Sequence, residues 1–414
     1  MIVEFAGPDA GTAPLTWGQR AIWAAILATE PDDHYFTFAR RVRVPSARTV
    51  PEVLAALGAL VERHASLRTR LGERREPYQR LVEKGRLAVT DATVEELLAE
   101  RFDYENDWPL RVALRTEGDR VTEVVLAFCH LAADGAGAEV AVRDLRMLLL
   151  GRPPAGVAPS PLELARWQAG PEGRRVADQA AAHWAAGHRR MPSTMFATPG
   201  PGDSPRIWRA LLRSPALDLA ARAIAAGHRA STSTVLLAAV AQLVGRHSGQ
   251  DTCAVLPIVG NRFRRDTVSI VSTLSMEGLF MLGVGQPFTE TLRAAGAASL
   301  RAYRSAYHDP ADRDRIALEE SERRGEQVHP YCCFNDMRFA DPGPAACDPA
   351  AIEAALPDTT LEWPMSQDHL ACRFCVHLTT EGVSLTADTR YLPKAGIEHF
   401  LRDLEALLVE AATR

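Results

Sequence analysis

Apolar residues recur in the first part of the chain with two different periods. In residues 36–44 the phenylalanines and valines fall on period two, which predicts a strand with one buried face. In residues 53–61 they recur at helical spacing, and Thr49 with Pro51 provides a helix start just before them. A capping-box pattern at 93–96 predicts another helix. Helices and strands therefore alternate from the beginning of the chain.

A predicted hairpin follows. Apolar strands at 110–114 and 121–129 flank the turn residues 117–119. A sharp loop at 133–137 then separates the second strand from a helix that ends near residue 150. The hairpin, the loop and this helix complete the elements predicted for the first half of the chain.

Prolines punctuate residues 151–204, which reads as a region connecting two halves. The second half is predicted to have helices at 216–229, 233–247, 289–306 and from 394 onward, and strands at 208–212, 252–259, 268–282, 330–338, 371–378 and 382–390. Because both halves mix helices with hairpins, we predict the α+β class.

Length, charge and cysteine usage narrow the picture. A chain of 414 residues is longer than one ordinary hydrophobic core accommodates, which suggests two domains or subdomains. The net charge of -5 gives no global reason to bind nucleic acid or an anionic membrane. The longest apolar stretch, 235–244, is too short to span a bilayer, and the acidic N-terminal segment is unlike a secretory peptide. We therefore expect a cytoplasmic protein whose 7 cysteines are reduced thiols.

The segment 124–135 holds the most informative chemistry. Its apolar strand ends at His130, and Asp134 with Gly135 turns the chain shortly afterwards. An imidazole at the mouth of a rigid strand could act as a general base, and a glycine N–H could face a developing oxyanion. From these residues alone, a structural histidine is the commoner interpretation.

This segment resembles the HHxxxDG motif of nonribosomal peptide synthetase condensation domains and related CoA-dependent acyltransferases. Further stretches resemble the same family in the same order, at 14–23, 63–69, 102–111, 231–234, 249–251, 260–262, 270–282 and 334–335. An ordered set of this length is far more specific than one motif.

The resemblance implies two chloramphenicol-acetyltransferase-like subdomains forming a V, with the active site at their interface. The first, 1–170, would carry the motif in the form CHxxxDG, and the second would be 171–414. An acyl thioester on a carrier-protein phosphopantetheine would enter from one side and an amine or alcohol from the other. Neither a metal nor a bound cofactor is implied, although CoA could replace the carrier.

The resemblance also assigns roles to residues. His130 would orient or deprotonate the nucleophile, and Gly135 would donate its N–H to the oxyanion. Asp134 would be structural at the site and paired with Arg262. The chain departs from the motif at Cys129, which stands in place of the first histidine. Because adjacent strand residues point to opposite faces, we expect Cys129 to face the packing behind His130.

Three further features have weaker assignments. Asn335 could face the tunnel and hydrogen-bond substrate, or it could hold a loop. His308 could line the acceptor side, although a solvated helix end is the commoner interpretation. Cys372 and Cys375 could suggest zinc, but they would point to opposite faces of a strand and no second Cys-x-x-Cys pair exists. We therefore predict no metal.

The sequence thus predicts a free-standing condensation enzyme, monomeric, working with an acyl or peptidyl carrier protein in trans. It would form an amide or ester in specialised-metabolite biosynthesis, such as antibiotic biosynthesis. The alternatives are a CoA-dependent O-acyltransferase, an epimerase of the same superfamily, and a catalytically silent condensation-like docking module. Neither nucleic acid nor membrane is an expected partner.

Overall fold

The structure is a computed structural model that describes residues 1–196, 198–339, 341, 343–370 and 372–414. Its contacts divide the chain into two compact units. The first is Met1–Arg175 with Gly260–Ser275, and the second is Val176–Val259 with Met276–Arg414. The segment Gly260–Ser275, which the sequence analysis placed in the second half, therefore packs with the first unit. A division at 170/171 stays a prediction.

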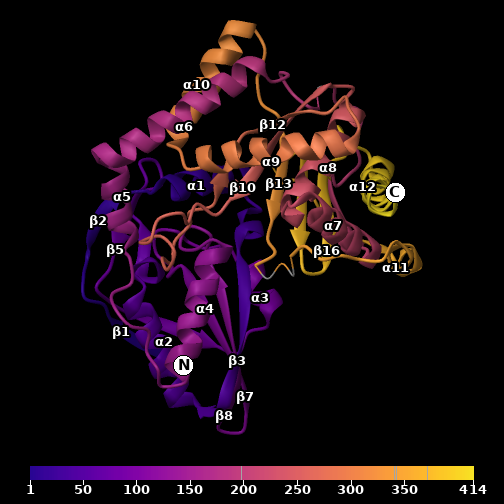
Figure 1. The fold of residues 1–414 in the computed structure, drawn as a ribbon. Coiled ribbons are helices and arrows are strands. Elements are labelled where there is room, and N and C mark those ends of the chain that lie inside the picture. Colours follow the sequence, from indigo (N-terminus) through magenta and orange to yellow (C-terminus); the bar gives the residue numbers. More distant parts are fainter. Residues whose placement is uncertain (197, 340, 342, 371) are drawn as a thin grey trace. The chain divides into compact units, whose positions relative to one another are not determined.

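The main sheet of the first unit has the strand order β1-β6-β7-β8-β3. Figure 1 labels β1, β3, β7 and β8 of this sheet. Its strands are β1 (Ile2–Ala6), β3 (Phe38–Thr49), β6 (Lys84–Thr90), β7 (Leu110–Glu117) and β8 (Arg120–Phe128). β6 and β7 pair in parallel, whereas β7 and β8 form the antiparallel hairpin that the sequence predicted. Phe36 lies before β3, so the predicted strand begins later than its pattern suggested.

Helices cover both faces of this sheet. On one face Leu126 and Phe128 belong to the core cluster formed with α2 (Val50–Arg63) and α4 (Gly135–Leu149). On the other face Val125 and Ala127 pack with α3 (Val94–Ala99). This alternation follows from the two-residue period of a strand. Two helix starts predicted from the sequence are confirmed, since Thr49 and Thr93 form the capping boxes of α2 and α3.

A smaller sheet, with the order β2-β5-β4, completes the strands described in the first unit. The remaining elements of this unit are β2 (Gly11–Pro14), β4 (Thr69–Leu71), β5 (Tyr78–Leu81), α1 (Trp17–Thr29), α5 (Pro161–Ala169) and the 3-10 turns Asp33–Phe36 and Ala65–Arg68. α5 contacts β2 and supplies Leu162 and Ala165 to a cluster with Ala13 and Leu81.

The sheet of the second unit has the order β11-β10-β13-β15-β16-β9-β14, with β12 paired to β10. Its strands are β9 (Ile207–Arg213), β10 (Thr252–Val259), β11 (Met276–Glu277), β12 (Phe280–Gly283), β13 (Cys332–Asp336), β14 (Thr360–Gln367), β15 (Phe374–Thr379) and β16 (Gly382–Asp388). The helices are α7 (Pro215–His228), α8 (Thr232–Ser248), α9 (Phe288–Ser305), α10 (Pro310–Arg324), α11 (Pro349–Ala354) and α12 (Lys394–Thr413), and α6 (Pro171–Arg190) spans the division after Arg175. One large apolar core joins α7, α8, α9 and α12 to this sheet.

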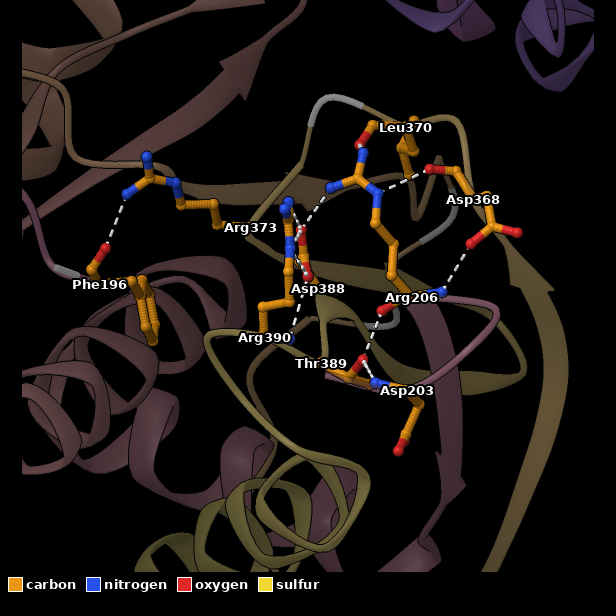
Figure 2. A network of polar contacts seen from close by, with 9 residues as sticks. All are labelled: Phe196, Asp203, Arg206, Asp368, Leu370, Arg373, Asp388, Thr389 and Arg390. Atoms are coloured by element: carbon orange, nitrogen blue, oxygen red, sulfur yellow. Dashed lines mark hydrogen bonds and ion pairs between the residues drawn. The ribbon is translucent and has the colours of Figure 1, made fainter. Parts of the chain in front are cut away.

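A buried carboxylate ties the end of β16 to the start of β9 (Figure 2). Asp388 is 1% exposed and accepts from Arg206 and Arg390, each at 2.6 Å. The side chain of Arg206 also donates to the carbonyl of Asp368 at 2.8 Å. Burial opposes ionisation, but the hydrogen bonds from Arg390 and the charge of Arg206 together lower the pKa of Asp388. The network therefore holds the loop that contains Asp368 against the adjoining ends of β16 and β9.

The predicted strand at 268–282 is wrong over most of its length. Of these residues, the structure pairs Met276–Glu277 and Phe280–Gly283 as strands. The backbone N–H groups of Leu274 and Ser275 donate to the carboxylate of Asp134. Because those donors are already used, the segment packs on the first unit instead of extending a sheet. The predicted strand at 371–378 begins at Phe374, and residue 371 lies outside the described residues.

The expectation of reduced thiols throughout is also wrong. Cys333 and Cys375 face each other in register on the parallel strands β13 and β15 and form a disulfide. They are separated by 42 residues, so strand pairing alone brings them together. The other cysteines are free, with Cys129, Cys253 and Cys332 buried.

Among the described residues, no cluster of three or more His, Cys, Asp or Glu side chains could hold a metal ion. Among the same residues, no helix has the length and apolar character needed to cross a membrane.

Candidate active site

His130 lies in the turn that follows β8, directly beyond the buried end of that strand. Its half-buried ring packs edge-on against Phe38 at 5.4 Å and against Phe36 at 6.4 Å between ring centroids. Burial lowers the pKa of His130, and the nearby carboxylate of Asp134 only partly opposes this effect. The imidazole is therefore neutral near pH 7 and can accept a proton.

The turn after His130 is tight and delivers Asp134 to the start of α4. Backbone N–H groups of Ala132 and Ala133 donate to the carbonyl of Cys129 at 2.9 and 3.4 Å. Asp134 then acts as the N-cap of α4, where its carboxylate accepts from the N–H of Gly137 at 2.8 Å. A short capping side chain at this position is what stabilises a helix start.

The carboxylate of Asp134 is enclosed by donors from the segment Gly260–Ser275. The guanidinium of Arg262 binds both carboxylate oxygens, at 2.6 and 2.9 Å. Ser275 donates from its N–H at 2.9 Å and from its hydroxyl at 2.8 Å, and the N–H of Leu274 donates at 3.0 Å. The ion pair that the family resemblance implies is therefore present, within the first unit.

Burial and charge act in opposite directions on this carboxylate. Asp134 is 1% exposed, and burial alone would raise its pKa. The charge and hydrogen bonds of Arg262, with the N–H of Gly137, outweigh burial and lower the pKa below its ordinary value. Asp134 is therefore a permanently ionised anchor and is unsuited to proton transfer near neutral pH.

Gly135 is the first residue of α4 and is partly exposed. Its N–H belongs to the first turn, where backbone donors have no partner inside the helix and the helix dipole is positive. Two residues later, Gly137 lies so close to the backbone of Ser272 that a Cβ there would be 2.9 Å from the carbonyl oxygen. The start of α4 therefore packs closely against the segment Gly260–Ser275, which carries Arg262.

Cys129 lies beyond the last residue of β8 but is buried, with 4% of its surface exposed. It packs in an apolar cluster with Trp23, Ile26 and Leu131. Burial raises the pKa of its thiol to about 12, so the group is a neutral thiol. This environment agrees with the expected packing position and does not provide the low pKa that a nucleophilic cysteine needs.

Asn335 and His308 belong to the second unit. Asn335 is half-buried on β13, in register with His377 of β15. His308 is 2% exposed and packs edge-on against Trp184 at 5.0 Å, so the alternative of a solvated helix end is wrong. Burial and then Arg313 lower the pKa of His308 to about 3. The suggested substrate contacts of both residues stay predictions.

Sequence reasoning missed the polar residues that hold the motif in place. Thr273 and Ser275 interrupt the apolar run that predicts a strand, and their hydroxyl groups donate to the carbonyl of His130 and to the carboxylate of Asp134. That interruption was the available signal, since hydroxyl side chains in a buried segment require hydrogen-bond partners. The hydroxyl of Ser66 also supports the motif, because it donates to the carbonyl of Ala132. No comparable signal points to it, because the residues beside Ser66 do not indicate its partner.

Comparison with known proteins gives one family and one fold. Residues 9–282 match the family described as Condensation domain. The probable non-canonical nonribosomal peptide synthetase CymA of Salinispora arenicola (strain CNS-205) is 28% identical over 357 residues. The match covers 78% of this chain but 4% of CymA, so this chain corresponds to a small part of that relative.

Two solved structures share the fold. One describes condensation domain-mediated chain release from the enacyloxin polyketide synthase, with a TM-score of 0.74, 19% identity and coverage of 99% of this chain and 84% of that one. The other is the complex of the X-domain and OxyB from teicoplanin biosynthesis, with a TM-score of 0.70, 18% identity and coverage of 99% and 95%. At these identities the likeness shows the α+β fold and leaves the reaction open.

Proposed function

Because the chain belongs to the condensation domain family, we propose that it transfers an acyl or aminoacyl group from a carrier-protein phosphopantetheine thioester to an amine. A hydroxyl acceptor, giving an ester, is the lesser variant of the same reaction. The carrier would be supplied by another chain. The thioester provides the activation, so the protein supplies positioning, a base and oxyanion stabilisation.

One observation carries this proposal. The short turn that follows His130 ends at Asp134, whose carboxylate is fixed at both oxygens by Arg262. This anchoring supports a rigid geometry in which a neutral imidazole and the N–H of Gly135, at the start of α4, act on one reacting carbonyl.

In the proposed reaction His130 acts first as a base and then as an acid. The acceptor nitrogen attacks the thioester carbonyl while His130 takes its proton, and the N–H of Gly135 donates to the tetrahedral oxyanion. Collapse of this intermediate breaks the carbon–sulfur bond, and protonated His130 returns its proton to the departing phosphopantetheine thiolate. A base of this kind contributes typically about 10²–10⁴-fold to a rate.

Intact-mass spectrometry of a loaded carrier protein tests the proposal. The full chain is mixed with an aminoacyl-phosphopantetheine carrier protein and a panel of amine acceptors. We expect loss of the acyl group from the carrier that depends on both the amine and His130. His399→Ala is the matched control, because the side chain of His399 is 70% exposed. Transfer from acyl-CoA to an alcohol would support the O-acyltransferase alternative instead, and deuterium wash-in at the aminoacyl group would indicate an epimerase.

A second candidate function is docking without catalysis. Cys129 favours it, because this chain lacks the first histidine of the motif. The X-domain from teicoplanin biosynthesis shares the fold and forms a complex with OxyB. Binding of the loaded carrier protein with an unchanged acyl mass over the panel would support docking and contradict the proposed transfer.

A further inference from the structure

Three successive backbone carbonyls after Cys129 each accept a hydrogen bond from a side chain. The hydroxyl of Thr273 donates to the carbonyl of His130. The side-chain amide of Gln19 donates to the carbonyl of Leu131 at 3.3 Å. The hydroxyl of Ser66 donates to the carbonyl of Ala132 at 2.6 Å. All these residues belong to the first unit.

The three donors come from separate parts of the chain. Gln19 lies on α1, Ser66 lies in the 3-10 turn Ala65–Arg68, and Thr273 lies in the segment Gly260–Ser275. Gln19 is 3% exposed, and both hydroxyl residues are 1% exposed. At such burial an unpaired donor or carbonyl is strongly disfavoured, so each bond restricts where the turn can lie.

Thr273 differs from the other two donors because its segment also binds Asp134. Arg262, near one end of the segment, pairs with the carboxylate of Asp134, whereas Thr273 binds the carbonyl of His130. The same segment therefore contacts the motif at both His130 and Asp134. Room for this approach comes from Gly18, where a Cβ would clash with the carbonyl oxygen of Thr273.

The residue at position 129 cannot supply equivalent support. A cysteine thiol is a weak hydrogen-bond donor, and this one is buried among apolar side chains. An imidazole in the same place would have offered a strong donor. The turn thus depends on donors from elsewhere in the unit.

We propose that Thr273, assisted by Ser66 and Gln19, is the positioning residue that fixes the backbone of His130 and thereby aims its imidazole. The expected effect on catalysis rests on the proposed function, whereas the fixing of the His130 backbone by Thr273 does not. Thr273 acts through His130 and does not itself contact the reacting atoms. Its loss should lower kcat and leave the KM for the acceptor largely unchanged, because binding contacts remain.

A pair of variants separates the hydroxyl from the bulk of the side chain. Thr273→Val keeps the shape and removes the donor, whereas Thr273→Ser keeps the donor. Thr291→Val is the matched control, because Thr291 is 0% exposed and its hydroxyl has no partner in the part of the chain that the structure describes. Thermal unfolding of each variant checks that the fold survives.

Two readouts need no substrate. The first is the ¹H–¹³C signal of the His130 ring and its pH titration, and the second is the carbethoxylation rate of His130 with diethyl pyrocarbonate, mapped by peptide mass spectrometry. We expect Thr273→Val to shift the signal and change the rate by about threefold or more, with Thr273→Ser and Thr291→Val close to the parent protein. These readouts stay informative even if the proposed transfer reaction fails.

A third readout applies once turnover is measured with the aminoacyl carrier protein. Thr273→Val should lower kcat about 10- to 100-fold, the range expected for a misplaced catalytic group, and Thr273→Ser should restore most of it. If Thr273→Val does not fold, Ser66→Ala is tested with the same readouts. An unchanged His130 signal and reactivity in a folded variant without the donor, or equal losses in Thr273→Val and Thr273→Ser, would overturn the proposal.

Discussion

Asp134 is held more tightly than any exposed carboxylate could be, because both of its oxygens face buried donors. Its partner Arg262 is itself only 13% exposed and also donates to the backbone carbonyls of Gly260 and Ser272 at 3.0 and 3.1 Å. The pair therefore joins the motif to the segment Gly260–Ser275. Removing one member leaves the other buried and uncompensated.

Arg262→Met should therefore lower the free energy of unfolding by about 3–5 kcal/mol, as is usual when one partner of a buried ion pair is removed. Arg41→Met is the matched control, because Arg41 pairs with Glu123 at 2.9 Å but its side chain is 67% exposed. That variant should cost about 0–1 kcal/mol. Guanidinium chloride unfolding followed by tryptophan fluorescence measures both, and equal losses would contradict a special role for Arg262.

Cys129 and His130, which directly follow β8, should respond differently to substitution by alanine. His130→Ala should lower product formation about 100-fold or more, because the proposed base is removed. Cys129→Ala should retain most of the activity, because the buried thiol is neutral and packs among apolar side chains. Product formation from the loaded carrier, with circular dichroism to verify folding, measures both effects. A folded but inactive Cys129→Ala would show that the thiol takes part in the reaction.

At the scale of elements, the start of α4 owes its position to a close backbone contact. Gly137 faces the carbonyl of Ser272, and the first turn of the helix carries the cap residue Asp134. The predicted loop at 133–137 therefore ends early, because residues 135–137 already belong to the helix. The cap and the carboxylate anchor are the same residue, so helix start and site geometry are coupled.

A glycine-to-alanine pair tests this contact. Gly137→Ala should destabilise the protein by about 1–3 kcal/mol, because the new methyl overpacks a rigid backbone site. Gly296→Ala, in the middle of α9 with nothing within 4 Å of its Cβ position, should instead stabilise it by about 0.5–1 kcal/mol. Chemical unfolding measures both variants. A stabilising Gly137→Ala would mean that α4 and Ser272 can separate.

At the scale of the whole molecule, buried ionisable groups set the response to pH. Burial lowers the pKa of His308 and of His377 to about 3, aided by Arg313 and Arg209. Between about pH 6.5 and pH 3 the unfolded chain binds protons at these residues, whereas the folded chain does not. Unfolding is therefore favoured as the pH falls through this window.

We expect the free energy of unfolding to decrease from about pH 6.5 downward, with each such histidine contributing up to about 1.4 kcal/mol per pH unit. His308→Gln, which removes one titrating group, should flatten the dependence between about pH 6.5 and pH 4.5, above the range where carboxylates titrate. Chemical unfolding at several pH values measures the slope. His399→Gln is the control, since His399 is exposed, and an unchanged slope in His308→Gln would contradict the assignment.

The sequence by itself determined the features that depend on local pattern. The β7–β8 hairpin, the capped starts of α2 and α3, and the position of His130 just beyond a buried strand all follow from neighbouring residues. The pairing of Asp134 with Arg262 was reached through family resemblance and is present in the structure.

Tertiary structure alone decided the contacts between distant segments. It placed Gly260–Ser275 in the first unit, joined Cys333 to Cys375 and buried His308 against Trp184. It also brought Thr273 to the carbonyl of His130, across 143 positions of the chain. The spacing of apolar residues indicates which face of a helix or strand is buried, but it does not indicate which other element packs against that face. Buried polar groups find partners only after the chain has packed, so the support of the site is a property of the fold.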